Sequence, residues 1–323
     1  MSQESTAERG AALVIVLLAI TLLTVLVVEF AYSTQIDQHL AHNAARSLQA
    51  AYLARSGVNL ALLALKQDAQ VSSIDALNEE WARALPPLPV GEGVVTIRVT
   101  DEQGKLNLNA LRNSNGTINM QWRQTAERLF MLRGVELSLL DPVLDWLDAD
   151  DFPEPRGAEK NYYLGLTPAY TARNGAFLTL GELGRVAGLT PAIRARLDEV
   201  VTVLPESANT INENTAPRDV LAALFPSVEA KRLDAFMAAR IDMPSHGRND
   251  LRERLGLPPR TQEEGVNLTN PRSEFFSIAA VATIGTVSQL LRVTVHRRAG
   301  EVIPLSWQPL PFTAPGGSDV YSE

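Results

Sequence analysis

The sequence predicts an α+β fold in which a long N-terminal helix packs on an antiparallel sheet that is interrupted by a large helical region. Apolar residues recur at helical spacing from about residue 11 to about residue 67. Segments rich in β-branched residues lie on both sides of a long gap, and helix signals fill that gap. An amphipathic helix and a half-buried sheet each need an apolar partner, so we expect them to pack together.

The helix begins with an unbroken apolar run over residues 11–28, at the lower end of the length that spans a bilayer. Arg9-Gly10 stand directly before the run, and Glu29 closes it. A secretory signal is cut after its apolar core, whereas the processing point here, between Gly10 and Ala11, lies before the core. Cutting there leaves the helix on the mature chain as an anchor. A single-pass anchor that is never cut is the alternative.

Composition limits the functions that fit the remaining chain. The 323 residues are 46% hydrophobic and 20% charged, enough for a packed core, and the net charge of −8 is poorly suited to gripping phosphate backbones. With no cysteine there is neither a disulfide framework nor a thiolate metal site. The four histidines are scattered, and no nucleophile elbow or phosphate-binding loop occurs. We therefore expect a protein that is not an enzyme.

The elements follow in order along the chain. A short helix is expected over 73–85, ended by Pro86, and a hairpin is expected from strand 94–100, turn 101–104 and return strand 105–109. Three strands are expected near the C-terminus. They cover 275–284, 287–297 and 302–307. The helices expected between the hairpin and these strands cover 125–132, 137–147, 179–186, 191–197, 217–224 and 228–240.

The densest acidic cluster contains Asp145, Asp148, Asp150 and Asp151, with Glu159 shortly after it. Carboxylates crowded on one loop repel each other unless a cation lies among them, and oxygen ligands without cysteine or histidine favour Ca²⁺. Phe152 and Pro153 occupy positions where an EF-hand needs a ligand and a glycine, so this is not an EF-hand. A solvated acidic loop, with Asp145 as a helix-end residue, remains the alternative.

Two helix pairs, over 179–197 and 217–240, are similar to helix–hairpin–helix units, which in DNA-binding proteins meet phosphates through a Gly-rich turn. The second turn, Phe225-Pro-Ser-Val228, has no glycine, and few lysines flank either pair. We expect a protein-binding helical module and no nucleic-acid partner. A membrane-anchored DNA-uptake protein is the rival hypothesis.

Together these segments resemble the K-type minor pseudopilins of the bacterial type II secretion system (general secretion pathway protein K). The resemblance rests on Arg9-Gly10 with the apolar helix, on Asp101-Glu-Gln-Gly-Lys-Leu-Asn-Leu-Asn109, on Asp145-Trp-Leu-Asp-Ala-Asp-Asp151 with Gly157-Ala-Glu159, and on Ile211-Asn-Glu-Asn-Thr-Ala-Pro217. It implies a pseudopilin fold carrying an inserted helical domain. A minor pilin of a type IV pilus, whose anchor would look much the same, is the alternative.

The family implies a domain order of prepilin leader (1–10), transmembrane helix (11–32), helix stem with the first strands (33–110), inserted α-helical domain (111–255) and C-terminal strands (256–323). It also implies cleavage and N-methylation at Ala11 by prepilin peptidase, an inner-membrane anchor and a periplasmic domain. Calcium would be held by the acidic loop, carried onto Asp148, Asp150, Asp151 and Glu159.

Ile15 bears on the place of the subunit in a filament. Other pseudopilins have a glutamate at this position, five residues into the mature chain, which neutralises the N-terminal amine of a neighbouring subunit. The K-type family lacks it, and Ile15 is the residue here. The resemblance therefore implies a tip position, in complex with the I-type and J-type minor pseudopilins.

Overall fold

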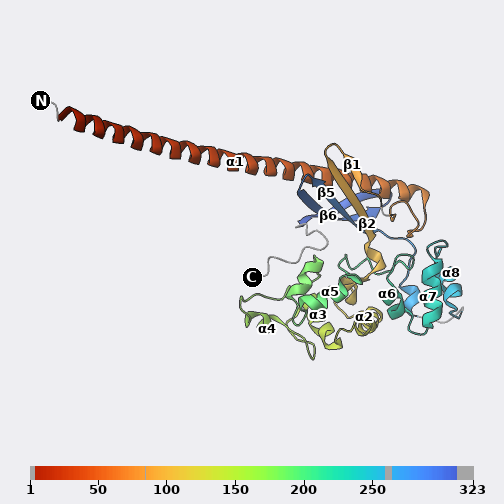
Figure 1. The fold of residues 1–323 in the computed structure, drawn as a ribbon. Coiled ribbons are helices and arrows are strands. Elements are labelled where there is room, and N and C mark those ends of the chain that lie inside the picture. Colours follow the sequence, from red (N-terminus) through yellow and green to blue (C-terminus); the bar gives the residue numbers. More distant parts are fainter. Residues whose placement is uncertain (1–3, 84, 259–263, 311–323) are drawn as a thin grey trace.

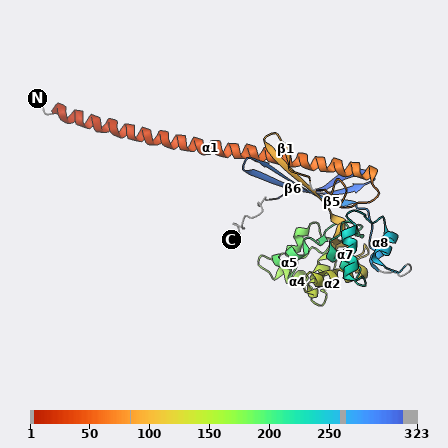
Figure 2. The same ribbon diagram turned by 45° about the vertical axis from the view of Figure 1, so that its right-hand side comes forward.

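The structure is a computed structural model and describes residues 4–83, 85–258 and 264–310. Figure 1 shows a long helix, a sheet beneath its C-terminal part, and a block of helices beneath the sheet. In the turned view of Figure 2 the block again lies far from the N-terminus. The predicted α+β fold, a long helix on an antiparallel sheet with additional helices, is confirmed.

The long helix is α1, Glu4–Val71, which begins before and ends after the predicted limits. Only its C-terminal part packs on the sheet, where Ala54, Val58 and Leu65 are fully buried. Gly57 faces strand β2 at close range, because a Cβ built at this position would lie 2.9 Å from Cγ2 of Val95. The missing side chain therefore lets the helix axis approach the sheet closely.

The sheet has five antiparallel strands in the order β1-β2-β5-β6-β7. Their bounds are Leu88–Val90 (β1), Gly93–Asp101 (β2), Phe275–Ile284 (β5), Val287–Arg298 (β6) and Glu301–Leu310 (β7). The three predicted C-terminal strands are confirmed as β5, β6 and β7. Strand β2 pairs with β5 along its whole length, so two segments far apart in sequence close the sheet around the insertion.

The predicted hairpin is wrong. The return strand does not pair with β2, because Leu106–Asn107 (β3) pairs in parallel with Val201–Thr202 (β4) inside the helical block. Between β2 and β3 the chain makes a 3-10 turn, η1 (Glu102–Gly104), which the Asp101 carboxylate caps by accepting the Gln103 N–H at 2.8 Å. The segment with hairpin-like composition therefore leaves the sheet.

The helix predicted over 73–85 is also wrong, because the described residues there form turns and bends. The Glu79 carboxylate accepts the Ala76 N–H and the Trp81 indole N–H, both at 2.9 Å. The buried Asp75 carboxylate accepts the Ser273 N–H at 2.7 Å. Side-chain acceptors that capture backbone N–H groups compete with a helix, and here they hold the turns.

The insertion between β2 and β5 contains the helices of the lower block. Their bounds are Met120–Leu132 (α2), Leu140–Leu147 (α3), Lys160–Leu164 (α4), Pro191–Leu197 (α5), Arg218–Leu224 (α6), Ala230–Ala239 (α7), Arg248–Leu255 (α8) and Glu264–Asn267 (α9), with 3-10 turns at Leu108–Leu111 (η2), Leu137–Leu139 (η3) and Leu180–Arg185 (η4). Each helix expected in this region overlaps one of these elements. The first hairpin-like pair is η4 with α5, and the second is α6 with α7.

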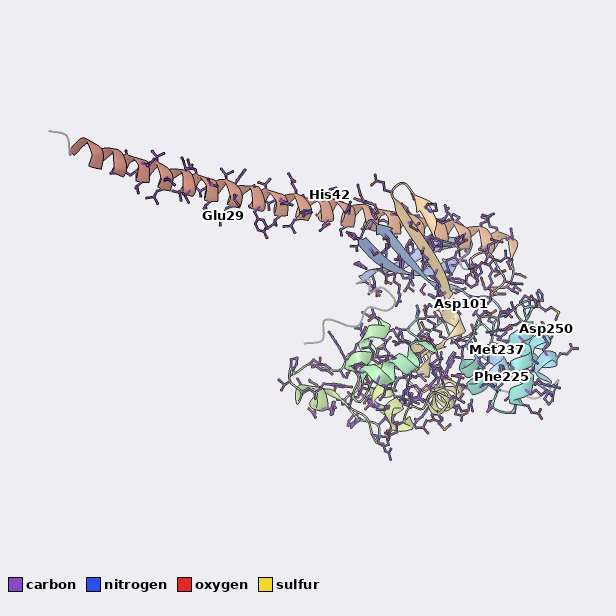
Figure 3. All side chains as sticks on the ribbon, in the orientation of Figure 1. Glu29, His42, Asp101, Phe225, Met237 and Asp250 are labelled. Atoms are coloured by element: carbon purple, nitrogen blue, oxygen red, sulfur yellow. The ribbon has the colours of Figure 1, made fainter. Side chains whose placement is uncertain are left out.

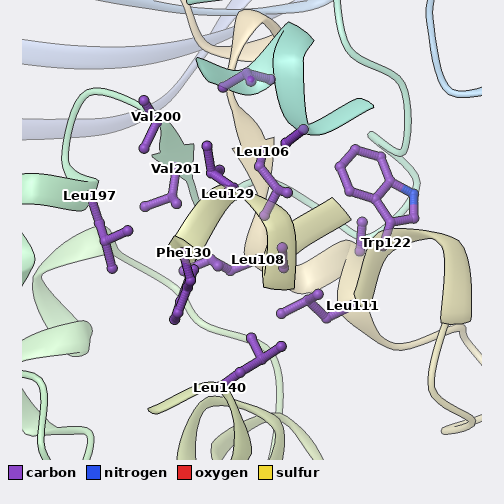
Figure 4. Close-up of a cluster of buried hydrophobic side chains, with 14 of the residues drawn as sticks. Leu106, Leu108, Leu111, Trp122, Leu129, Phe130, Leu140, Leu197, Val200 and Val201 are labelled. Carbon is purple, nitrogen blue, oxygen red and sulfur yellow. The ribbon is translucent and has the colours of Figure 1, made fainter. Parts of the chain in front are cut away.

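A separate hydrophobic core holds the block together, with Leu106, Trp122, Leu129, Phe130 and Val201 among its buried members (Figure 4). Helix α2 begins earlier than predicted because Asn119 caps it, its side chain accepting the Trp122 N–H at 3.4 Å. The block is therefore a separately packed unit, connected to the sheet at the C-terminal end of β2 and the N-terminal end of β5.

Candidate metal centre

Three carboxylates converge where the acidic motif connects α3 to α4. Asp145 lies within α3, Asp148 is the residue directly after it, and Glu159 directly precedes α4. One oxygen from each lies within 4.8 Å of one from each of the others. Their side chains are buried, with exposed fractions of 0%, 8% and 6%. The loop between the two helices therefore folds back and brings acids from both of its ends into one buried group.

Four carboxylate oxygens in this group have no hydrogen-bond partner among the described residues. They are Asp145 Oδ2, Asp148 Oδ1, Glu159 Oε1 and Glu159 Oε2. The other two oxygens are engaged, since Asp145 Oδ1 accepts the Glu154 N–H at 2.9 Å and Asp148 Oδ2 accepts from Arg112. Buried acceptors without donors are costly, and a hard cation bound among them would remove that cost.

The electrostatics of the three acids show the same crowding. Burial, together with the charges of the nearby Asp148 and Asp145 carboxylates, raises the pKa of Glu159 to about 7. Burial also raises the pKa of Asp148 to about 6, against the lowering effect of Arg112. The pKa of Asp145 is raised mainly by burial. The positive charge of one arginine is therefore not enough to keep the pKa values of three adjacent acids in their ordinary range.

The surroundings of the group are tightly packed. A Cβ added at Gly157 would lie 1.7 Å from Asp145 Oδ2, so only glycine fits beside this carboxylate. The Trp146 ring stacks on Phe177 with centroids 6.1 Å apart and meets the Tyr163 ring edge-on at 5.5 Å. Aromatic packing fixes the end of α3, and the acids project from a rigid support.

The structure brings together only part of the sequence-predicted ligand set. Asp148 and Glu159 join the group, but Asp150 and Asp151 are exposed and lie outside it. Asp150 Oδ1 accepts the Phe152 N–H at 2.8 Å, and Asp151 Oδ1 accepts from the Asn174 side chain at 3.2 Å. Sequence reasoning missed Asp145 as a member, although its spacing of three from Asp148 near the end of a helix was an available signal.

A second cluster of acids, made of Asp68, Asp75 and Glu79, lies where α1 ends. Here the protein supplies its own cation, because the buried Arg297 guanidinium of β6 contacts both Asp68 and Asp75. The same guanidinium lies over the Phe276 ring, 4.7 Å from its centroid. This cluster is an ion-pair network joining the helix end to the sheet.

The residues predicted for processing lie on the N-terminal part of α1, which is long and apolar enough to cross a membrane. Gly10 and Ala11 are consecutive exposed residues of that helix, and the Ile15 side chain is 66% exposed. Figure 3 shows Glu29, which ends the apolar run, midway along the free part of the helix. No other part of the described structure touches the apolar run, as expected for a membrane anchor.

Comparisons with known proteins agree with this architecture. The family model for type II secretion system (T2SS) protein K matches residues 104–206. Type II secretion system protein K of Pseudomonas aeruginosa is 30% identical over 97% of this chain and 97% of its own length. The corresponding protein of Aeromonas hydrophila is 26% identical over 92% of this chain and 96% of its own.

A solved structure shares the fold. It belongs to the crystal structure of the GspK-GspI-GspJ complex from the enterotoxigenic Escherichia coli type 2 secretion system, with a TM-score of 0.73 and 20% sequence identity. The match covers 82% of this chain and 97% of that one. Membrane helix, sheet, inserted helical block and full-length relatives thus lead to one assignment: the chain belongs to the type II secretion system protein K family, the K-type minor pseudopilins.

Proposed function

We propose that this chain is the tip subunit of a periplasmic pseudopilus and helps export folded proteins across the outer membrane. The observation that carries the proposal is the position of the helical block, at the end of the molecule away from the apolar part of α1 (Figure 2). A block in that position obstructs the stacking of a further subunit above it. Family membership favours this role over a type IV minor pilin or a DNA-uptake protein.

Ile15 supports the tip position independently of the block. A subunit below the tip must offer a carboxylate to the N-terminal amine of the subunit above it, because a buried amine needs a partner. Ile15 has no such group. It is therefore suited to a subunit that has no neighbour above it.

The proposed maturation is cleavage between Gly10 and Ala11 by prepilin peptidase, followed by methylation of Ala11. Arg9 would stay on the cytoplasmic side of the inner membrane, and the sheet and helical block would lie in the periplasm. The intact mass of the membrane-extracted protein, from cells with and without the peptidase, tests this. A chain beginning at methylated Ala11 only when the peptidase is present is expected; a chain beginning at Met1 or Ser2 in both strains would refute it.

The proposed partners are the I-type and J-type minor pseudopilins. The support is the solved neighbour, which is a K-type chain in a complex with both. Full-length chain extracted with the two partners should elute from a sizing column as one complex containing all three. Omitting each partner in turn is the control. Separate elution of this chain at micromolar concentration, with both partners folded, would refute the assembly.

We further propose that the candidate metal centre binds Ca²⁺ as a structural ion. Asp145, Asp148 and Glu159 would be its carboxylate ligands, and Asp150 and Asp151 would lie at its rim. The support is the set of buried carboxylate oxygens without donors and the glycine-only wall at Gly157. Because the ligands lie at the end of α3 and directly before α4, a bound ion would tie the two helix ends together. No histidine or nucleophile is in the group, which fits a structural role.

A further inference from the structure

The segment Ile211-Asn212-Glu213-Asn214-Thr215 lies at the joint between the sheet and the helices α7 and α8. It is one of the sequence motifs typical of the family, and the metal centre does not use it. Asn212, Glu213 and Asn214 are at most 1% exposed, which is unusual for three consecutive polar residues. Their side chains therefore hold parts of the molecule together.

Toward the sheet, the segment is bound through a fully satisfied polar network. The Asn212 side chain donates to the Asp75 carbonyl, to Asp101 Oδ2 and to Ser273 Oγ, at 2.9–3.0 Å. The Thr215 hydroxyl donates to Asp101 Oδ2 at 2.6 Å. Asp101 lies at the boundary between sheet and block in Figure 3. Burial raises the pKa of Asp101 to about 6, but donors fill both of its oxygens.

Toward the helices, the segment is bound to the end of α7 and to Ser245 in the loop between α7 and α8. Asn214 and Ser245 exchange two hydrogen bonds, of 2.7 and 2.9 Å, between the Asn214 amide and the Ser245 backbone. The Arg240 guanidinium donates to the Glu213 carbonyl at 2.7 Å, and the Ser245 hydroxyl donates to Glu213 Oε1 at 3.0 Å. The segment is thus a direct link between the sheet and the α7–α8 helices.

The Glu213 carboxylate is the weak point of this link. Its Oε2 is buried without a hydrogen-bond partner among the described residues, as is Nε of Arg240. The charged groups that face it are Arg240 at the end of α7, and Arg248 and Asp250 on α8. Arg248 lowers the pKa of Glu213 and Asp250 raises it, so these two charges act against each other. On the sheet side, the neighbouring Asn212 contacts the Asp101 carboxylate and the Asp75 carbonyl, and Arg297 binds the Asp75 carboxylate.

We propose that Glu213 is a proton-controlled latch: while neutral it holds α7 and α8 against the 211–215 segment, and loss of its proton loosens them. A neutral carboxyl tolerates the buried position, whereas an ionised one places a charge on Oε2 with no donor to stabilise it. The latch is independent of the proposed role in secretion.

The direction of the pH dependence follows from linkage. Burial raises the pKa of Glu213 to about 7, from an ordinary value of 4.5. The folded chain therefore keeps a proton that the unfolded chain releases, so this contribution to stability is present below the ordinary pKa and is lost as the pH rises through about 7. Tightening on acidification is the expected behaviour.

The test is a distance measurement between spin labels in the full-length chain in detergent micelles. The chain has no cysteine, so Asn59→Cys on α1 and Ala235→Cys on α7, both exposed positions, can be labelled uniquely. The distance distribution should be narrow at about pH 5.5 and broader at about pH 8. With Glu213→Gln added, which is permanently neutral, it should be narrow at both.

His246→Gln is the matched control, because His246 is an exposed histidine that adjoins Ser245. His246→Gln should broaden with pH as the unsubstituted chain does. Equal widths at both pH values in the unsubstituted chain would overturn the latch, as would loss of the broadening in His246→Gln or its persistence in Glu213→Gln. If Glu213→Gln does not fold, equal widths in the unsubstituted chain or loss of the broadening in His246→Gln still overturns the latch.

Discussion

Glu159 is the residue on which the calcium proposal depends most. It is 6% exposed, and neither of its carboxylate oxygens has a hydrogen-bond partner among the described residues. Asp148 forms an ion pair with Arg112, and Asp145 accepts a hydrogen bond from the Glu154 N–H, so each of them stabilises the fold without a metal. The Glu159 carboxylate makes no such contact within the described residues, and a bound cation would give it a partner.

Replacing Glu159 by Gln should therefore abolish most of the stabilisation by calcium. Calcium at about a hundred times its dissociation constant would stabilise the unsubstituted chain by about 2.7 kcal/mol, and the variant should lose most of this gain. Calorimetric melting with calcium and with EGTA measures it. Glu206→Gln, an exposed acid in another loop, is the control. An equal gain in Glu159→Gln and the unsubstituted chain would contradict the site.

The calcium effect should also grow with pH. Without metal, the raised pKa values of Glu159, about 7, and Asp148, about 6, mean that the folded chain binds more protons than the unfolded chain. Their contribution to stability is present at low pH and is lost as the pH rises through those values. Calcium binds the ionised acids, so the stabilisation that it provides increases as the pH rises.

The difference in melting temperature between calcium and EGTA should consequently be small near about pH 5 and large near about pH 8. A scan of both conditions across this range measures the difference, and Glu159→Gln should flatten it. A difference that stays constant with pH in the unsubstituted chain would mean that these carboxylates are not the ligands.

Two of the four predicted ligands converge in the structure, and the reason is local geometry. Spacing along the chain placed Asp148 and Glu159 at the two ends of one loop, as found. It could not show that Asp150 and Asp151 would turn outward and bond to Phe152 and Asn174. Nor could spacing show that Asp145 would be drawn in, since this depends on the loop returning across Gly157.

At the scale of elements, periodicity predicted the helices and strands whose formation depends on residues close together in the sequence. Helix α1 and the strands β5, β6 and β7 followed from alternation and spacing alone. The two failures involve distant partners: β2 pairs with β5 across the whole insertion, and the turns after α1 are held by contacts with Ser273 and Arg297. A single sequence contains no signal for such pairings.

The packing of α1 on the sheet predicts the effect of a substitution at Gly57. Gly57→Leu should destabilise by about 1–3 kcal/mol despite the better helix propensity of leucine, because the new side chain meets Val95 and Ile97 of β2. Chemical denaturation measures the loss. Ser56→Leu, on the exposed side of the same turn, should not destabilise the chain. Equal stabilities for the two variants would mean that α1 does not sit this close to β2.

At the scale of the whole molecule, the chain is divided into three parts: the apolar part of α1, the sheet and the helical block. The apolar part of α1 stands free, the sheet packs under its C-terminal part, and the helical block lies beyond the sheet (Figure 1). The network of Asp101, Asn212 and Ser273 fixes the block on the sheet. Composition and motif order predicted a helical insertion, but its position depends on these buried contacts between distant segments.

The most direct test of the tip proposal is the position and number of copies of this chain in an assembled pseudopilus. Gold labelling of an epitope added to the exposed turn around Ser114 of the helical block should mark one end of each filament and no other part. Filaments assembled without this chain are the control for background labelling. Labels at one end are the predicted result; labels distributed along the filament would show that neither the helical block nor Ile15 confines the chain to the tip, and would contradict the account.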